Sequence, residues 1–126
     1  MTIHNQIIGK NGEQQATNHY VAEGYEIIAQ NWNYYLGDKI GEIDLIVKKD
    51  NILVFVEVKT RTNDKLGDPA LQITKKKLIC IYKSYQGFIK KHPEFRQLFV
   101  RMDLVAITGA ELMVYKNCYS FEGIMR

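Results

Sequence analysis

Two acidic residues and a lysine lie in two neighbouring apolar segments in the middle of the chain. Asp44 belongs to the first segment, and Glu57 and Lys59 belong to the second. Between the segments, Asp50 and Asn51 form a polar pair typical of a two-residue β-turn, so the pattern predicts a β-hairpin. In such a hairpin, the numbers of two paired residues add up to the same total as the numbers of the two turn residues, 50 and 51. In this register Asp44 lies directly across from Glu57.

Two opposed carboxylates repel each other, because cross-strand neighbours hold their Cβ atoms about 5 Å apart. Protonation of one carboxylate, a neighbouring cation or a divalent metal between hard oxygen donors would compensate the repulsion. Lys59 follows Glu57 on the same face and would lie beside such a metal without binding it. The set therefore predicts a site for Mg²⁺ and a phosphate group. The alternative is that each charge is a solvated residue at a strand end. The same register puts Glu42 across from Lys59.

Apolar residues on both faces of the predicted hairpin argue against a solvated surface. Strict alternation places Ile43, Leu45, Val47, Val54, Val56 and Val58 on one face, whereas Ile46, Leu53 and Phe55 share the other face with the charges. A strand pair that is apolar on both sides belongs to the centre of a covered sheet. Charged groups in such a place are costly unless they have a function.

Residues 41–46, Gly-Glu-Ile-Asp-Leu-Ile, and residues 54–61, Val-Phe-Val-Glu-Val-Lys-Thr-Arg, resemble the signature of the bacterial YraN-like family. That family belongs to the PD-(D/E)XK nuclease superfamily and is similar to archaeal Holliday junction resolvases. The resemblance covers nearly the whole chain. It implies an α/β fold of the restriction-endonuclease-like type, with a mixed central β-sheet flanked by helices.

The resemblance also implies roles for individual residues. Asp44 and Glu57, with the main-chain carbonyl of Val58, would hold Mg²⁺ or Mn²⁺, and Lys59 would orient or activate the attacking water. Glu13 matches an acidic residue on the first helix of resolvases, and Gln72 is the nearest match to a glutamine that helps to shape their site. Because resolvases act on two DNA strands as dimers, the resemblance further implies a homodimer.

Length and composition limit the interpretation. We expect 126 residues to form a single nuclease-like domain, residues 1–126. The N-terminus has no secretory pattern and no apolar run approaches the roughly 20 residues of a membrane span, so we expect a cytoplasmic protein. Cys80 and Cys118 have no spacing typical of zinc or of a disulfide framework and are predicted to be buried apolar residues.

The basic residues are unevenly distributed. Thirteen lysines and arginines but only five acids lie between Lys48 and Arg101, so this half carries about +8 of a chain whose net charge is +3. Such asymmetry favours a polyanionic partner. The predicted nucleic-acid contacts are Arg61, Lys65, Gln72, Lys75, Lys76 and Lys77. Residues 75–77 begin a predicted helix, where cations oppose the helix dipole unless a phosphate is present. Lys83, Lys90 and Lys91 are interpreted as a solvated helix face.

The elements that would position these residues follow from periodicity and capping. The pattern predicts helices at 5–23 and 74–91, the latter capped by Thr74, and strands at 25–34, 99–107 and 111–115 besides the hairpin at 41–61. Glu13 shares an inward stripe of the first helix with Ala16 and Tyr20. Gly12 would be costly in a helix unless its neighbours need a close approach.

Two further groups allow more than one interpretation. Asp103 in the predicted strand 99–107 is a rival carboxylate, although a strand carrying such a residue packs late in the sheet of the YraN-like family, which favours a structural role. Trp32, Tyr34 and Tyr35 could stack on unpaired bases. Closing a sheet edge is the more frequent role of such aromatic residues, and we favour it here.

Together these features predict metal-dependent hydrolysis of phosphodiester bonds in DNA, with branched DNA such as Holliday junctions as a candidate substrate. The alternative is a nucleic-acid-binding module that keeps the nuclease fold, cuts little and serves as an adaptor in DNA repair or uptake. A third hypothesis, RNA as the ligand, rests on the same basic surface.

Overall fold

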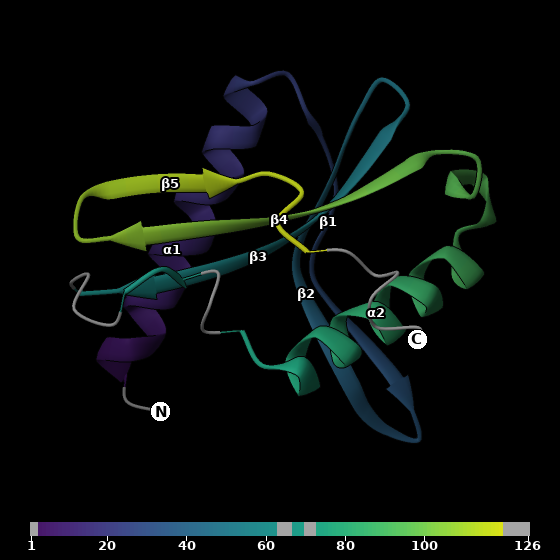
Figure 1. Ribbon diagram of the computed structural model, residues 1–126, viewed down its shortest axis with the longest axis horizontal. Coiled ribbons are helices and arrows are strands. Elements are labelled where there is room, and N and C mark those ends of the chain that lie inside the picture. Colours follow the sequence, from purple (N-terminus) through teal and green to yellow (C-terminus); the bar gives the residue numbers. More distant parts are fainter. Residues whose placement is uncertain (1–2, 63–66, 70–72, 120–126) are drawn as a thin grey trace.

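The computed structural model describes residues 3–62, 67–69 and 73–119. Its elements surround one five-stranded sheet, with α1 and α2 on opposite faces (Figure 1). The helices are α1 (Ile3–Ala22), α2 (Lys75–Lys91) and the short 3-10 helix η2 (Pro93–Phe95), and the strands are β1 (Glu26–Leu36), β2 (Asp38–Lys49), β3 (Ile52–Arg61), β4 (Phe99–Thr108) and β5 (Glu111–Tyr115). The predicted α/β class is confirmed, and a mixed sheet between two helices is consistent with a restriction-endonuclease-like fold.

The strands lie in the order in which they occur in the chain, and only the β3–β4 pair is parallel. Parallel neighbours need a long crossover connection, which α2 supplies. The β2–β3 turn has the predicted two residues, so that Lys49 pairs with Ile52 and Leu45 pairs with Val56. Asp50 adopts a left-handed conformation with φ 54°, which aspartate tolerates better than most residues. The predicted hairpin register is therefore confirmed over this length.

Each face of the sheet carries its own apolar layer. Under α1, Ala16 and Tyr20 pack with Leu45, Val47, Val54, Val56, Val105 and Ile107. Under α2, Phe88 packs with Ile43, Ile46, Leu53 and Phe55. The prediction of a strand pair covered on both sides is confirmed. The placement of Ile43 with Leu45 on one face was wrong, because Ile43 belongs to the α2 layer.

Glycines allow both helices to approach the sheet closely. A Cβ at Gly12 would overlap Thr60 Oγ1 of β3, so contact with the sheet explains this residue in α1. A Cβ at Gly41 of β2 would collide with the Ser84 side chain and would lie 2.9 Å from the Cys80 carbonyl oxygen of α2. These contacts fix α1 over β3 and α2 over β2, the strands that carry the candidate site.

The element boundaries differ from prediction mainly at the β1–β2 connection. The chain reverses at Gly37 with φ 76°, and β2 begins at Asp38, before the predicted start at Gly41. On β1, Trp32 packs edge-on against Phe88 of α2 and stacks on Tyr34, which agrees with the favoured structural role. Tyr35 is 55% exposed.

Neither α1 nor α2, the long helices of the described chain, has the length and apolar character needed to cross a membrane. Cys80 and Cys118 are both free thiols. Each is half-buried, so the prediction that they are buried was wrong in degree.

Candidate functional site

The candidate site lies where β2 and β3 separate, a feature we call the fork. The paired residues of the two strands end at Leu45 and Val56; beyond this point β2 follows β1 and β3 follows β4, and the two ribbons diverge (Figure 1). At the fork, Asp44 Oδ2 accepts a hydrogen bond of 2.8 Å from the backbone N–H of Val58. The side chain of Asp44 thus holds the two strands together where their ladder ends.

The regular alternation of β2 between the two faces of the sheet is interrupted at the fork. Ile43 faces α2 and Leu45 faces α1, although residues two apart on a regular strand face the same side. On β1, Gln30 pairs with Leu45 and Trp32 pairs with Ile43. Asn31 between them adopts a left-handed φ of 50°. This change of face between Ile43 and Leu45 accounts for the wrong prediction at Ile43.

The carboxylates of Asp44 and Glu57 are electrostatic neighbours. Burial and then the charge of Glu57 raise the pKa of Asp44 from 3.8 to about 8, while the Val58 N–H opposes this rise. Burial also raises the pKa of Glu57, whereas Lys77 and a hydrogen bond with Asp44 lower it. The structure therefore brings the two predicted acids together across the fork, although they are not a regular ladder pair.

Lys77 of α2 is the cation that approaches this pair. Its Nζ lies 3.5 Å from Glu57 Oε1, and the Glu57 side chain is only 17% exposed. Sequence analysis assigned Lys77 to phosphate binding and missed this acidic partner, because the two residues belong to elements joined by a long connection. Lys75 and Lys76 are exposed in the same helical turn, which Thr74 caps as predicted by accepting a 3.1 Å hydrogen bond from Lys77 N.

Glu13 borders the other side of the site. A cavity of about 260 Å³ is lined by Glu13, Gln14 and Thr17 of α1, Gln30 and Asn31 of β1, and Asp44. The charge of Glu13 contributes to the raised pKa of Asp44. The structure thus places Glu13 toward a cavity at the fork, as predicted. Sequence analysis missed Thr17 and Gln30, which share a 3.3 Å hydrogen bond, because neither belongs to a recognisable motif.

Lys59 is half-buried on β3, two residues after Glu57. Among the described residues, no hydrogen bond or ion pair is formed by its side chain. The prediction that Glu42 lies across from Lys59 was wrong, because β2 has left β3 at that point and Glu42 forms a 3.2 Å ion pair with Lys39 instead.

Three predicted nucleic-acid contacts lie beyond Lys59. Arg61 donates hydrogen bonds to Gly67 O at 2.6 Å and to Thr108 Oγ1 at 3.2 Å, so its guanidinium stabilises the end of β3. Lys65 and Gln72 lie outside the described residues.

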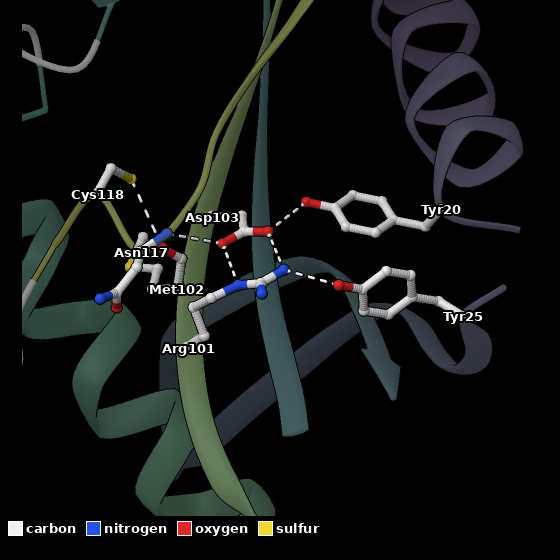
Figure 2. Close-up of polar contacts among 7 residues, drawn as sticks. All are labelled: Tyr20, Tyr25, Arg101, Met102, Asp103, Asn117 and Cys118. Carbon is white, nitrogen blue, oxygen red and sulfur yellow. Dashed lines mark hydrogen bonds and ion pairs between the residues drawn. The ribbon is translucent and has the colours of Figure 1, made fainter. Parts of the chain in front are cut away.

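The rival carboxylate, Asp103 of β4, has a full set of hydrogen-bond donors and is 0% exposed (Figure 2). Oδ1 accepts from Arg101 Nε at 2.8 Å and from Asn117 N at 2.9 Å. Oδ2 accepts from Tyr20 OH at 2.7 Å and from Arg101 Nη2 at 2.9 Å. Burial, and then the charge of Asp103, raise the pKa of Tyr20, which keeps this hydroxyl protonated as a donor. This geometry supports the structural role favoured for Asp103.

The donor set at the fork suits one kind of metal ion. No group of three or more His, Cys, Asp or Glu side chains comes together as a metal cage in the parts of the chain that the structure describes. Mg²⁺ does not require such a cage, because it retains several waters and binds through one or two carboxylates together with substrate phosphates. Asp44, Glu57 and the carbonyl of Val58 are hard oxygen donors of the type that this ion prefers, and two adjacent carboxyl groups with raised pKa values would gain from a divalent cation.

The fold and the site define an α/β domain with a forked mixed sheet and an acidic pair at the fork. Comparison with known proteins identifies its family: the model of the uncharacterised protein family UPF0102 matches residues 12–107, a range that includes Glu13, Asp44, Glu57 and Lys59. The chain belongs to the UPF0102 family. This confirms the predicted YraN-like membership, whereas the wider nuclease superfamily remains a prediction.

Relatives in distant bacteria carry the same family name. A UPF0102 protein of Flavobacterium johnsoniae is 38% identical over 123 residues, covering 96% of this chain and 90% of its own. A UPF0102 protein of Chloroherpeton thalassium is 44% identical over 103 residues, covering 82% of this chain and 76% of its own. A third, from a Sulfurihydrogenibium species, is 36% identical over 114 residues, covering 90% and 95% of the two chains.

Proposed function

We propose that the protein is a metal-dependent endonuclease of the PD-(D/E)XK type that hydrolyses phosphodiester bonds in DNA. Branched DNA, such as a Holliday junction, is its candidate substrate. The observation that carries the proposal is the pair of half-buried carboxyl groups of Asp44 and Glu57, both with raised pKa values, with Lys59 two residues further along β3. Acidic residues that have shifted pKa values and interact electrostatically with each other are typical of catalytic sites.

The residues divide the chemistry among them. Mg²⁺ or Mn²⁺ held by Asp44, Glu57 and the Val58 carbonyl would polarise the phosphate and lower the pKa of a bound water. Asp44 and Glu57 would hold the cation in their deprotonated form, so their raised pKa values imply that protons would leave both groups when it binds. The ammonium group of Lys59 stabilises the negative charge that develops on the phosphate and orients the water. Glu13, across the 260 Å³ cavity from Asp44, fixes water or a second ion at the site.

The first turn of α2 supplies phosphate contacts next to this centre. Lys75 and Lys76 are exposed there, and Lys77 lies 3.5 Å from Glu57. A cation bound by Glu57 would weaken the Lys77–Glu57 ion pair and leave Lys77 free to contact the phosphate backbone. A homodimer would present two such centres to the two strands of a branched substrate.

One observation favours the second candidate, a nucleic-acid-binding module with little cleavage. Lys77 already compensates Glu57, so a metal ion is not the only source of positive charge at the fork. In that case Lys77 and the acidic pair would form a polar network, and the basic surface alone would bind nucleic acid.

The test combines cleavage with metal-dependent stability. Labelled single-stranded, duplex, flapped and four-way-junction DNA, and matching RNA, are incubated with the parent in Mg²⁺ or Mn²⁺, together with Asp44→Asn and Lys59→Ala. We expect Asp44→Asn to lose both cleavage and the thermal stabilisation that millimolar metal gives the parent. Lys59→Ala should keep the metal stabilisation while cleavage falls by about 10²- to 10³-fold.

Glu111→Gln on the exposed end of β5 changes charge by the same amount as Asp44→Asn and should behave as the parent. Unaltered metal stabilisation in Asp44→Asn would show that the metal site is misassigned. A parent that gains stability from metal but cuts none of the substrates would favour the binding module.

A further inference from the structure

A second cavity lies at the opposite end of α2 from Lys77. It has a volume of about 770 Å³, within the range of roughly 300–1,000 Å³ typical of ligand pockets. Its walls combine three tyrosines with three cations, namely Tyr34, Tyr82, Tyr85, Lys83, Lys90 and Arg96. Among the described residues, no acidic side chain lines it. We call this cavity the tyrosine pocket.

The aromatic wall is held in place by packing. Tyr34 stacks on Trp32 with ring centroids 5.8 Å apart, and the backbone of Gly87 approaches its ring so closely that a Cβ there would overlap it. Tyr82 accepts a 3.0 Å hydrogen bond from Gln86 Nε2. A rigid aromatic wall reduces the entropy cost of binding a flat, apolar surface.

The cations continue toward the fork. Lys76, Lys83 and Lys90 are seven residues apart and exposed, so they follow one stripe along α2. Because a helix rises 1.5 Å per residue, the tyrosine pocket at Lys90 lies about 20 Å along the axis from Lys77, which touches Glu57. A positively charged track therefore joins the acidic pair to the pocket.

We infer that the tyrosine pocket binds an unpaired segment of a nucleic-acid strand, with a base against the tyrosine rings and neighbouring phosphates along Lys83, Lys90 and Arg96. Aromatic rings beside a row of cations are the two elements of single-strand binding, since every base has a π-face and every nucleotide a phosphate. An apolar peptide would leave the three cations without partners. The inference revises the interpretation of Lys83 and Lys90 as a solvated face and gives Tyr34 a second role.

This inference rests on the proposed function in one respect: it specifies the substrate as a strand with an unpaired arm that leaves the fork along α2. Binding at the tyrosine pocket needs no metal and no cleavage, so it can be measured separately. Fluorescence anisotropy in EDTA compares single-stranded DNA, single-stranded RNA and blunt duplex DNA. We expect single-stranded DNA or single-stranded RNA to bind more tightly than the duplex. Which of the two binds more tightly shows whether the pocket prefers deoxyribose or ribose.

The decisive variant is Lys83→Ala combined with Lys90→Ala. Its matched control, Lys91→Ala with Lys116→Ala, removes the same charge from exposed lysines that do not line the tyrosine pocket. If both pocket lysines contact phosphates, the log-log salt slope for single-strand binding should decrease by about 1.4, at about 0.7 per phosphate. The control should retain the parent slope. Equal losses in the two variants would overturn the inference, because general attraction would then explain binding.

Photo-crosslinking of an oligonucleotide that contains 5-iodouracil tests the aromatic wall without altering the fold. We expect mass spectrometry to find crosslinks at Tyr34 or Tyr82, and crosslinks confined to other regions would overturn the proposal. Competition by an acidic polypeptide as effective as that by the oligonucleotide would also overturn it. If the parent crosslinks at the tyrosine pocket but cuts no substrate, only the proposed nuclease activity is refuted. A parent that cuts, and whose binding is unaffected by Lys83→Ala with Lys90→Ala, refutes only the pocket.

Discussion

Two acidic centres occupy this small sheet, one fully buried and one half-buried, and they are built in opposite ways. Asp103 accepts four hydrogen bonds from three residues, including both ends of the Arg101 guanidinium fork, and its charge is fully compensated. At the fork between β2 and β3, within the described residues, Asp44 accepts from one backbone N–H and Glu57 is paired with one lysine, besides the hydrogen bond between the two acids. The same residue type is stabilised in one place and destabilised in the other.

Asp103 is the more buried of the two aspartates, so the difference between the centres lies in the number of hydrogen-bond donors. A carboxylate that receives several charged or strongly polar donors stays ionised at little cost, whereas two carboxylates with few donors cannot both ionise. The raised pKa of Asp44, which results from burial and from Glu57, expresses this deficit. The Asp103 centre is therefore interpreted as a structural element. At the fork, by contrast, binding of an external cation would stabilise the folded protein.

The largest expected effect is on the structural centre. Asp103→Ala removes the acceptor of Arg101, Tyr20 and the Asn117 N–H at once, and leaving the half-buried Arg101 guanidinium without its partner costs about 3 kcal/mol, the lower end of the range for buried pairs. Chemical denaturation should show this loss in the free energy of unfolding, whereas Glu111→Ala on β5 should change it by less than about 0.5 kcal/mol. A loss below about 1 kcal/mol in Asp103→Ala would contradict the interpretation that Asp103, unlike the acids at the fork, stabilises the fold.

The fork should respond in the opposite direction. Asp44 has a folded-state pKa of about 8, above its unfolded value of 3.8, so its favourable contribution is complete below pH 4 and is lost as the pH rises toward 8. Asp44→Asn keeps an oxygen acceptor for Val58 N–H but cannot ionise. Without metal, we expect the variant to be more stable than the parent at pH 7 by roughly 1–3 kcal/mol.

Denaturation in EDTA between pH 4 and pH 9 checks this expectation. The parent should lose stability across the interval while Asp44→Asn loses much less, and Glu111→Gln should follow the parent. Parallel profiles for the parent and Asp44→Asn would mean that neither burial nor Glu57 raises the pKa of Asp44 in the folded protein.

Local sequence rules predicted the parts of the molecule that local chemistry controls. The Asp50 and Asn51 turn set the register of the hairpin, and Thr74 capped α2 as expected. Glu13 faces the site because the 3.6-residue periodicity of α1 turns it toward the sheet. These features depend on residues within a few positions of one another.

The fork depends on contacts between elements far apart in sequence. Alternation predicts that Ile43 and Leu45 share a face, but β2 leaves β3 to follow β1, and Gly41 packs against α2. The ion pair of Lys77 with Glu57 likewise forms only after the crossover through α2. Sequence periodicity does not predict contacts between distant elements. For this reason the pairing of Glu42 with Lys59 was predicted wrongly and the partner of Lys77 was missed.

The smallest expected effect concerns that ion pair. Lys77 lowers the pKa of Glu57, so Lys77→Met should raise this pKa and make the fold less stable only where Glu57 is ionised in the parent. Because Lys77 is 44% exposed, solvent screens the pair and the loss at pH 8 should stay below about 1 kcal/mol. Near pH 4, where both carboxyl groups are protonated, the variant and the parent should have equal stability. Lys76→Met, one residue away and exposed, should show no dependence on pH. An equal loss of stability at both pH values in Lys77→Met would mean that the lysine acts through its packing. Its charge would then not compensate Glu57.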